Sequence, residues 1–349
     1  MPARLEGIFE SIAPLKDLNP DKPIYGVAPI PGYDSYFVGK DQGKYACLLI
    51  KTGDEPSRLA PPIRLEKLDV QFDLRCHVTQ PREPERAEIF TVIRCRSLEV
   101  ETTRYFLSVC DTIIGMIGDR PARREVSSAV HRLAAIFQKM QKPPARPLNG
   151  LFGELFVISR SSSPPKAIAA WRVDEMGRFD FADGNARMDV KTTTGRTRSH
   201  TFSYDQCTPP PGTDAIAASL FVERSAGGLT LRALVADIET SITAYPDHVL
   251  KLHETIMGTL GDSFNEALGV GFDVRVSESS VRLYDLREVP AVRGPLPPGV
   301  TDVHFRSDLS ALDPLSIQAL IGRDAVFGHL LPRESWASVS SWLRPKKLL

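Results

Sequence analysis

Apolar and polar positions alternate through much of the first third of the chain, and this spacing predicts β-strands with one buried face. The expected strands are separated by clusters of Gly, Pro and Asp and lie at residues 45–50, 68–78 and 87–95. Residues 105–117 and 126–140 instead repeat apolar side chains at helical spacing, and a short helix is expected at residues 5–12. The pattern predicts a β-rich N-terminal domain over residues 1–125.

A proline-rich segment then separates this domain from the rest of the chain. Residues 126–147 combine a helix with a linker in which residues 142–147 contain three prolines, and proline cannot continue a helix. Residues 148–159 predict a new helix whose apolar stripe contains Leu151, Leu155 and Ile158. Glu154 lies at the edge of that stripe, where it can reach inward. We expect this helix to begin a second domain over residues 148–237.

Residues 178–193 predict a β-hairpin. One expected strand covers residues 179–181 and the other covers residues 186–193. The sequence Asp183-Gly184-Asn185 between them suits a tight turn, because Gly and Asn tolerate positive φ.

The register of this hairpin decides where its two aspartates lie. If Gly184-Asn185 forms the loop, Asp180 lies directly opposite Asp189; if Asp183-Gly184 forms it, Asp180 is diagonal to Asp189 on the same face. A plain three-residue loop would send the two carboxylates to opposite faces. Lys191 shares the face of Asp189 because side chains alternate along a strand.

Two carboxylates held so close repel each other unless a cation lies between them. Mg²⁺ or Mn²⁺ suits oxygen ligands and usually takes one or two protein carboxylates, with water and substrate phosphate completing its shell. Lys191 could orient or deprotonate a water and screen charge that develops on a phosphate. The pattern therefore favours metal-dependent phosphodiester hydrolysis. The alternative is an exposed strand face whose charges are solvated.

The remaining elements complete a mixed α/β arrangement. Strands are expected at residues 198–202, 215–223 and 229–236, with Ser203 as a helix N-cap and Gln206 in the first turn. Residues 238–349 form a mixed C-terminal region with helices at 238–260 and 314–342 and a hairpin over 272–276 and 281–286. We expect an α+β fold in which a central mixed sheet is flanked by helices.

Composition narrows the functional classes. Lysine and arginine together number 43, as do aspartate and glutamate, so the chain is no generic polycation and a nucleic acid must meet a local basic surface. Five cysteines without a C-x-x-C pair indicate reduced thiols. There is no apolar run of about 20 residues and no signal-peptide pattern, so we expect a cytoplasmic protein without membrane association. Protease, esterase, dehydrogenase and NTPase motifs are absent from the sequence.

The ordered set of helix glutamate, hairpin aspartates and lysine resembles the core of the PD-(D/E)XK nuclease superfamily. The resemblance extends to a bacterial group of PD-(D/E)XK proteins that is associated with restriction and phage defence. It covers residues 148–236 and is carried by Gly153-Glu154, Trp171, residues 179–181, 189–193 and 198–203, and Gln206. Phe179 stands where the superfamily name expects proline, and Asp189 takes the (D/E) place.

The resemblance implies a restriction-endonuclease-like fold and specific residue roles. Asp180 and Asp189, with the Val190 carbonyl and Glu154, would hold Mg²⁺ or Mn²⁺. Arg198, His200 and Gln206 would contact the DNA backbone; the alternative is that Arg198 and His200 lie along a sheet edge and Gln206 supports a helix start.

These residues predict a metal-dependent DNA endonuclease of bacterial restriction or antiviral defence. The partners expected are DNA and other defence-system subunits, including an ATPase, with a homodimer left open. The first alternative is a non-catalytic nucleic-acid-binding or scaffolding subunit, and the second is a nuclease acting on RNA or modified DNA, because the motif handles a phosphate without identifying the sugar or base.

Overall fold

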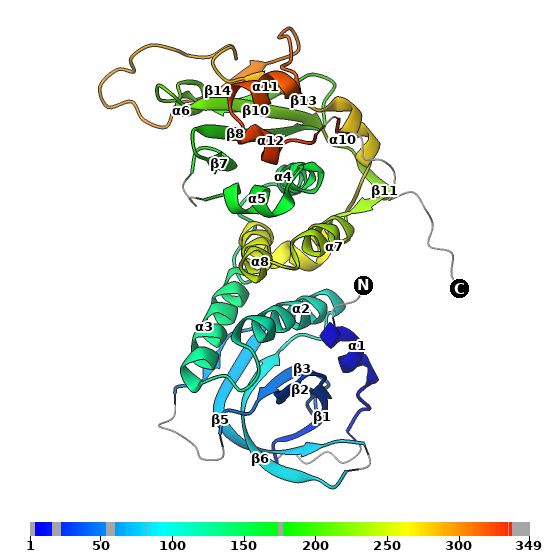
Figure 1. Ribbon diagram of the computed structural model, residues 1–349. Coiled ribbons are helices and arrows are strands. Elements are labelled where there is room, and N and C mark those ends of the chain that lie inside the picture. The colour runs from blue at the N-terminus through cyan, green and yellow to red at the C-terminus, as the bar shows by residue number, and fades with distance from the viewer. Residues whose placement is uncertain are drawn as a thin grey trace. The chain divides into compact units, whose positions relative to one another are not determined.

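Two units make up the chain in the computed structural model, which describes residues 4–15, 22–53, 60–81, 83–173, 177–333 and 335–336 (Figure 1). Unit 1 comprises Met1–Ala145 and Val249–Asn265, and unit 2 comprises Arg146–His248 and Glu266–Leu349. The chain first passes from unit 1 to unit 2 between Ala145 and Arg146, inside the proline-rich segment. Residues Val249–Asn265, which lie in the expected C-terminal region, pack with unit 1.

Unit 1 is built from a β-barrel and helices. Its elements in chain order are α1 (Arg4–Ser11), β1 (Ile24–Ile30), β2 (Tyr33–Lys40), β3 (Ala46–Ile50), β4 (Ile63–Arg64), β5 (Leu68–Thr79), β6 (Arg86–Cys95), α2 (Val100–Ile117) and α3 (Arg123–Lys139). The later segment adds part of α8 (Pro246–Leu260), a 3₁₀ turn (Gly261–Ser263) and the start of α9 (Phe264–Leu268). The strands predicted at residues 45–50, 68–78 and 87–95 are confirmed as β3, β5 and β6.

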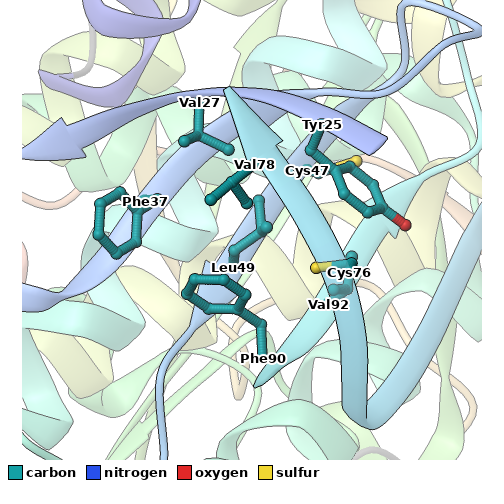
Figure 2. Close-up of a cluster of buried hydrophobic side chains, with 9 residues drawn as sticks. All are labelled: Tyr25, Val27, Phe37, Cys47, Leu49, Cys76, Val78, Phe90 and Val92. Atoms are coloured by element: carbon teal, nitrogen blue, oxygen red, sulfur yellow. The ribbon is translucent and has the colours of Figure 1, made fainter. Parts of the chain in front are cut away.

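The barrel closes because β1 pairs antiparallel with β2 and parallel with β5. The strand order is therefore β1-β2-β3-β6-β5 and back to β1, and the short β4 pairs with the first residues of β5. Side chains that alternate along these strands fill the interior with Tyr25, Val27, Phe37, Cys47, Leu49, Cys76, Val78, Phe90 and Val92 (Figure 2). The rings of Phe37 and Phe90 meet edge to face at 5.7 Å between centroids.

Unit 2 contains residues 148–236, the segment that resembles a nuclease core. The elements of the unit are α4 (Leu148–Arg160), α5 (Pro164–Ala170), β7 (Phe181–Asp183), β8 (Ala186–Thr193), β9 (Ser199–Ser203), α6 (Tyr204–Cys207), β10 (Asp214–Phe221), β11 (Arg224–Thr230), α7 (Leu231–Ile242), β12 (Gly271–Phe272), α10 (Val274–Ser280), β13 (Arg282–Asp285), β14 (His304–Asp308), α11 (Ile317–Arg323) and α12 (Phe327–Leu330). Among the described residues of the whole chain, no helix is long and apolar enough to cross a bilayer.

A mixed four-stranded sheet with the order β13-β10-β8-β7 forms the centre of unit 2. Strands β8 and β10 are parallel, and the two outer strands are antiparallel to their neighbours. Helices α4 and α5 lie along one face of the sheet (Figure 1). Against the other face, Phe202 of β9 packs with Ala215 and Ala217 of β10. The expected α+β fold is thus confirmed.

Helix α4 approaches the sheet closely because residue 153 is glycine. A Cβ atom built at Gly153 would lie 2.4 Å from Thr192 Cγ2 and 3.2 Å from Val190 Cγ1. The absence of a side chain therefore lets the helix backbone settle onto β8 and brings the next residue, Glu154, to a buried position.

Three predicted elements differ in the structure. Residues 231–236 belong to α7 and not to a strand, because Thr230 caps the helix by accepting a hydrogen bond from the Ala233 N–H. Residues 274–280 form α10 in place of a hairpin strand, because the Asp273 carboxylate accepts hydrogen bonds from two N–H groups of its first turn. The tail predicted as helical at 314–342 contains α11 and α12, and residues 337–342 lie outside the described part.

Candidate active site

The register of the β7–β8 hairpin brings the two aspartates together. Phe181 faces Met188 and Asp183 faces Ala186, so Gly184 and Asn185 form a two-residue turn. Gly184 has a φ of 48°, a conformation that glycine adopts without strain. One step beyond the last pair, Asp180 comes opposite Asp189, as expected for a Gly184-Asn185 loop.

Asp180 is held against the backbone of β8. Its Oδ2 atom accepts a hydrogen bond of 2.8 Å from the Val190 N–H, and its Oδ1 atom lies 3.3 Å from Nη1 of Arg146. The Asp180 carbonyl accepts a 2.7 Å hydrogen bond from the Arg172 N–H. These contacts fix the carboxylate with one oxygen directed toward a cationic side chain.

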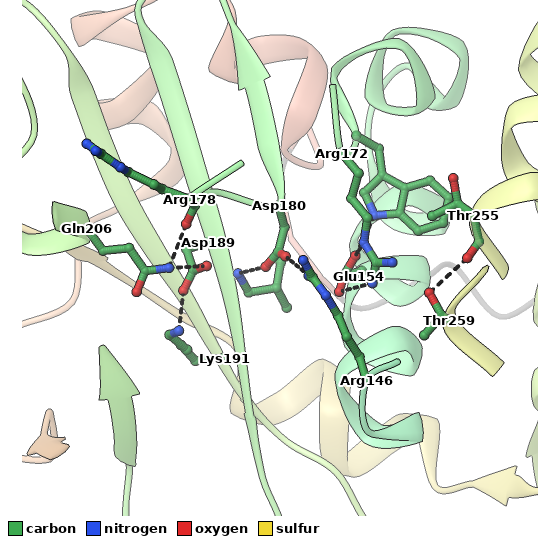
Figure 3. A network of polar contacts seen from close by, with 12 residues as sticks. Arg146, Glu154, Arg172, Arg178, Asp180, Asp189, Lys191, Gln206, Thr255 and Thr259 are labelled. Carbon is green, nitrogen blue, oxygen red and sulfur yellow. Dashed lines mark hydrogen bonds and ion pairs between the residues drawn. The ribbon is translucent and has the colours of Figure 1, made fainter. Parts of the chain in front are cut away.

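Asp189 is buried between a cation and an amide. Lys191 Nζ lies 2.7 Å from its Oδ2 atom, and Gln206 Nε2 donates to its Oδ1 atom at 2.9 Å (Figure 3). Burial raises the pKa of Asp189 to about 7; Lys191 opposes that shift and the neighbouring Asp180 adds to it. The amine of Lys191 also lies 5.0 Å from the centroid of the Phe202 ring.

Gln206 is placed by a capping box at the start of α6. The Ser203 hydroxyl accepts from the Gln206 N–H at 3.2 Å, and Gln206 Oε1 accepts from the Ser203 N–H at 3.1 Å. The predicted N-cap at Ser203 is confirmed. With its carbonyl oxygen used by the cap, the side-chain amide donates to both Asp189 and the Arg178 carbonyl. Gln206 therefore lies in the site, where its side chain orients the Asp189 carboxylate. Its predicted contact with DNA stays a prediction.

Glu154 is fixed by three internal donors. Arg172 donates to both of its oxygens at 2.8 Å, and Trp171 Nε1 donates to Oε2 at 2.5 Å. Burial and the charge of Asp180 raise the pKa of Glu154 to about 7, while Arg172 and Trp171 oppose the shift. Figure 3 shows Asp180 between Asp189 on one side and Glu154 on the other. Both Glu154 oxygens already accept hydrogen bonds within the protein. Direct metal ligation by Glu154 therefore stays a prediction.

Arg172 holds Glu154 from a left-handed backbone conformation. Its φ is 41°, a value that costs a non-glycine residue about 1 kcal/mol. The same residue uses its N–H on the Asp180 carbonyl, so one strained position supports two acids of the site.

Replacing Arg172 tests this support. We expect Arg172→Ala to lower the free energy of unfolding by about 3 kcal/mol, because a buried carboxylate loses its bidentate partner. Arg172→Gly loses the same ion pair but relieves the left-handed conformation, so its loss should be about 1 kcal/mol smaller. Urea unfolding of both variants measures this difference. A glycine variant less stable than the alanine variant would contradict the assignment of strain.

Arg198 and His200, both expected to contact DNA, have different surroundings. Arg198 is buried and donates to the Ser219 carbonyl and hydroxyl at 2.9 Å and to the Ser280 carbonyl, so the structure does not bring it into the site. His200 lines the same cleft as the aspartates but is 4 % exposed, and its Nε2 atom lies 2.7 Å from the Ser219 hydroxyl. Burial, with the charges of Lys191 and Arg198, lowers the pKa of His200 to about 4.

This low pKa predicts acid destabilisation. An unfolded histidine takes up a proton near pH 6.5, whereas His200 in the fold stays neutral until about pH 4. The unfolded state therefore binds more protons between these values, and up to about 3 kcal/mol of stability is lost as the pH falls from 6.5 to 4. His200→Gln should flatten this dependence in urea unfolding. An unchanged slope in His200→Gln would contradict the prediction.

The acid pair opens onto a cleft of about 1000 Å³ within unit 2. Its wall includes Asp180, Asp189, Lys191, the Thr192–Thr194 segment, and polar residues of β9 and β14. Strand β14, which pairs with β9 and was not predicted, brings His304 and Arg306 to the wall. Arg146 and Arg178 also line it. The cleft thus combines a buried acid pair with arginines at its wall; Asp205 and Asp302 line it too, and Asp205 lies 3.4 Å from Arg178.

The donor chemistry of the acid pair fits Mg²⁺ or Mn²⁺. Each aspartate presents one oxygen to a cationic side chain: Oδ1 of Asp180 to Arg146, and Oδ2 of Asp189 to Lys191. Across the described residues no group of three or more His, Cys, Asp or Glu side chains is arranged for a metal ion. Two carboxylates are nevertheless enough for a hard divalent ion that keeps several waters. A contribution from the Val190 carbonyl stays a prediction.

Sequence reasoning missed two arginines of this site. Arg146 lies at the end of the proline-rich segment, where its sequence gives no sign that it meets Asp180 34 residues later. Arg172 follows Trp171, but only the fold shows that both side chains meet Glu154 on α4. Neither contact has a local sequence signal.

Comparison with known proteins shows which family the chain belongs to. The family model described as "Putative PD-(D/E)XK family member (DUF4420)" matches residues 28–310, about four-fifths of the chain. The chain therefore belongs to this family, and its mixed α+β fold is consistent with a PD-(D/E)XK-like fold. No curated protein matches the chain, and no solved structure matches it.

Proposed function

We propose that this protein is a Mg²⁺- or Mn²⁺-dependent endonuclease that hydrolyses DNA phosphodiester bonds. The observation that carries the proposal is the convergence of Asp180, Asp189 and Lys191 at one end of a tight hairpin, inside an open cleft. Membership of the PD-(D/E)XK family supports the same chemistry.

Each residue of the site would have a defined task. A divalent ion, when bound by Asp180 and Asp189, supplies a nucleophilic water at neutral pH and neutralises charge on the phosphate. Lys191 would orient the attacking water and donate to a phosphate oxygen, because its amine lies beside Asp189 and lines the cleft. Gln206 keeps the Asp189 carboxylate in one orientation, and Val190 does the same for Asp180 through its N–H.

The test is a cleavage panel. Purified protein is incubated with single-stranded, duplex and modified DNA and with RNA, with Mg²⁺, with Mn²⁺ and with a chelator. The proposal expects cleavage of DNA that requires the divalent ion. Cutting that continues in chelator would contradict the metal dependence, and exclusive cleavage of RNA would replace the substrate class.

A second candidate is a non-catalytic nucleic-acid-binding or scaffolding subunit. The observation in its favour is that Arg172 and Trp171 already bind both oxygens of Glu154, which leaves two acids for an ion. Calorimetric titration with Mg²⁺ and Mn²⁺ discriminates between the candidates. Absence of binding at millimolar concentrations, with or without DNA, would favour the scaffold.

The biological setting that we propose is restriction or anti-phage defence in the bacterial cytoplasm. The family resemblance supports this setting, and the chain has no phosphate-loop lysine motif with which to drive its own movement along DNA. We therefore propose that other defence subunits, including an ATPase, act together with it. Co-purification of the tagged full chain with such an ATPase would support this assignment.

A further inference from the structure

Two arginine–carboxylate pairs lie in the candidate site, and their geometry differs. Arg172 binds both oxygens of Glu154 at 2.8 Å, and its side chain is 14 % exposed. Arg146 approaches Asp180 through one nitrogen at 3.3 Å, and its side chain is 42 % exposed. The first pair has the short bidentate geometry of a fixed structural contact. The second is a long, single, solvent-exposed contact, which is worth little and is readily broken.

Asp180 stays in place when its contact with Arg146 is broken. Its other oxygen is held by the Val190 N–H at 2.8 Å, within the hairpin itself. The oxygen that faces Arg146 is therefore the one available to a cation. A guanidinium and a divalent ion cannot both neutralise this oxygen at full strength, because their like charges repel.

The cleft offers the displaced guanidinium an anionic partner. Arg146 lines the same cleft as Asp189 and Lys191, at the side of Asp180 away from Gln206 (Figure 3). A planar guanidinium presents paired donors that match two oxygens of a phosphate, a geometry that a lysine cannot reproduce. A nucleic-acid strand whose scissile phosphate lies at the acid pair brings neighbouring phosphates along this wall.

We propose that Arg146 is a positioning residue with two partners. Its guanidinium neutralises Asp180 in the ion-free site, and it moves to contact a substrate phosphate when the acid pair binds a divalent ion. This inference rests on the proposed function, since it assumes that the acid pair binds an ion and the cleft binds a nucleic acid. It adds a role for a residue that the resemblance does not include. It also predicts opposite effects of one substitution on the two ligands.

The first measurement is calorimetric titration with Mn²⁺ alone. Arg146→Ala removes the competing charge, so the variant should bind Mn²⁺ up to about fivefold more tightly than the wild type. Arg146→Lys keeps the charge and should bind Mn²⁺ as the wild type does. The matched control is Arg282→Ala: Arg282 is exposed on β13, bonds to the carbonyls of Ser279 and Val281, and is separated from β8 by β10.

The second measurement is fluorescence anisotropy with a labelled DNA duplex in Mn²⁺. All variants carry Lys191→Ala as background so that the DNA stays intact. Arg146→Ala should weaken DNA binding about tenfold and reduce the dependence of log K on log salt by about one unit, as for one lost phosphate contact. Arg146→Lys should restore only part of the affinity, because it lacks the planar fork. Arg282→Ala should leave affinity and slope unchanged.

The outcomes separate the inference from the proposed function. If the wild type binds Mn²⁺ and the Lys191→Ala parent binds DNA, but Arg146→Ala changes neither affinity, this inference is overturned and the proposed nuclease function stands. If Arg146→Ala weakens Mn²⁺ binding, Arg146 supports the acid pair and does not compete for it, which also overturns the inference. If the wild type binds no Mn²⁺, the proposed function fails together with it.

Discussion

Lys191→Ala is expected to reduce the rate of DNA cleavage about a thousandfold. The amine of Lys191 lies 2.7 Å from Asp189 and reaches the cleft, so the substitution removes the one donor of the Asp-x-Lys segment that can meet a phosphate oxygen or the attacking water. Loss of a single such donor typically lowers a rate by two to three orders of magnitude. The loss of positive charge also raises further the pKa of Asp189 and makes its ionised form rarer at neutral pH.

The control is the substitution of a lysine that lies outside the site. Lys166 on α5 is exposed, and its Nζ atom lies 2.9 Å from His329 Nε2, outside the cleft wall. Plasmid cleavage by Lys166→Ala should match the wild type, and both variants should show the same buried-tryptophan fluorescence if they are folded. A folded Lys191→Ala protein that cuts within threefold of the wild-type rate would remove Lys191 from the mechanism.

Gly153→Ala should lower the stability of the protein, although it adds only one methyl group. Its Cβ atom would lie 2.4 Å from Thr192 Cγ2, far inside van der Waals contact, at the interface of α4 with β8. Thr192 is β-branched and lies on a strand, so its side chain has little freedom to withdraw. Overpacking of this kind costs about 1–3 kcal/mol. The shift of α4 would also move Glu154, and cleavage should fall with stability.

Gly150 on the same helix provides the control. A Cβ atom at this position has no heavy atom within 4 Å, so Gly150→Ala should gain up to about 1 kcal/mol from helix propensity alone. Urea unfolding followed by tryptophan fluorescence should place the two variants on opposite sides of the wild type. Equal shifts for both would show that α4 can move away from β8 without cost.

Local chemistry made part of this fold predictable. The β7–β8 turn follows from Gly184-Asn185, and the start of α6 follows from the Ser203–Gln206 capping box. Prediction failed where apolar residues fit both the alternating spacing of a strand and the spacing of a helix. Leu229 and Leu231 alternate like a strand, whereas Leu231, Leu234, Val235 and Ile238 follow a helical spacing, and the cap at Thr230 decides in favour of the helix.

The candidate site was predictable only as far as it is local. Asp180, Asp189 and Lys191 belong to one hairpin, so strand alternation and turn length place them together. The contacts of Glu154 and Arg146 depend on how α4 packs beside that hairpin, and β14 joins β9 from about 100 residues downstream. From the sequence, Arg198 was expected to contact DNA or to lie along a sheet edge, and only the positions of Ser219 and Ser280 show that its side chain bonds within the protein.

The return of Val249–Asn265 to unit 1 determines how this chain can be shortened. A fragment ending at Ala145 would lose the side chains of His253 and Phe264, whose rings pack on Tyr105 at centroid distances of 4.6 and 5.1 Å, and the Asn265 amide that bonds to Glu99. A fragment beginning at Arg146 would carry the same apolar segment without its partners at the start of α2. Limited proteolysis in the proline-rich segment should therefore leave the two pieces associated, because one backbone cut does not separate units that are interleaved along the sequence.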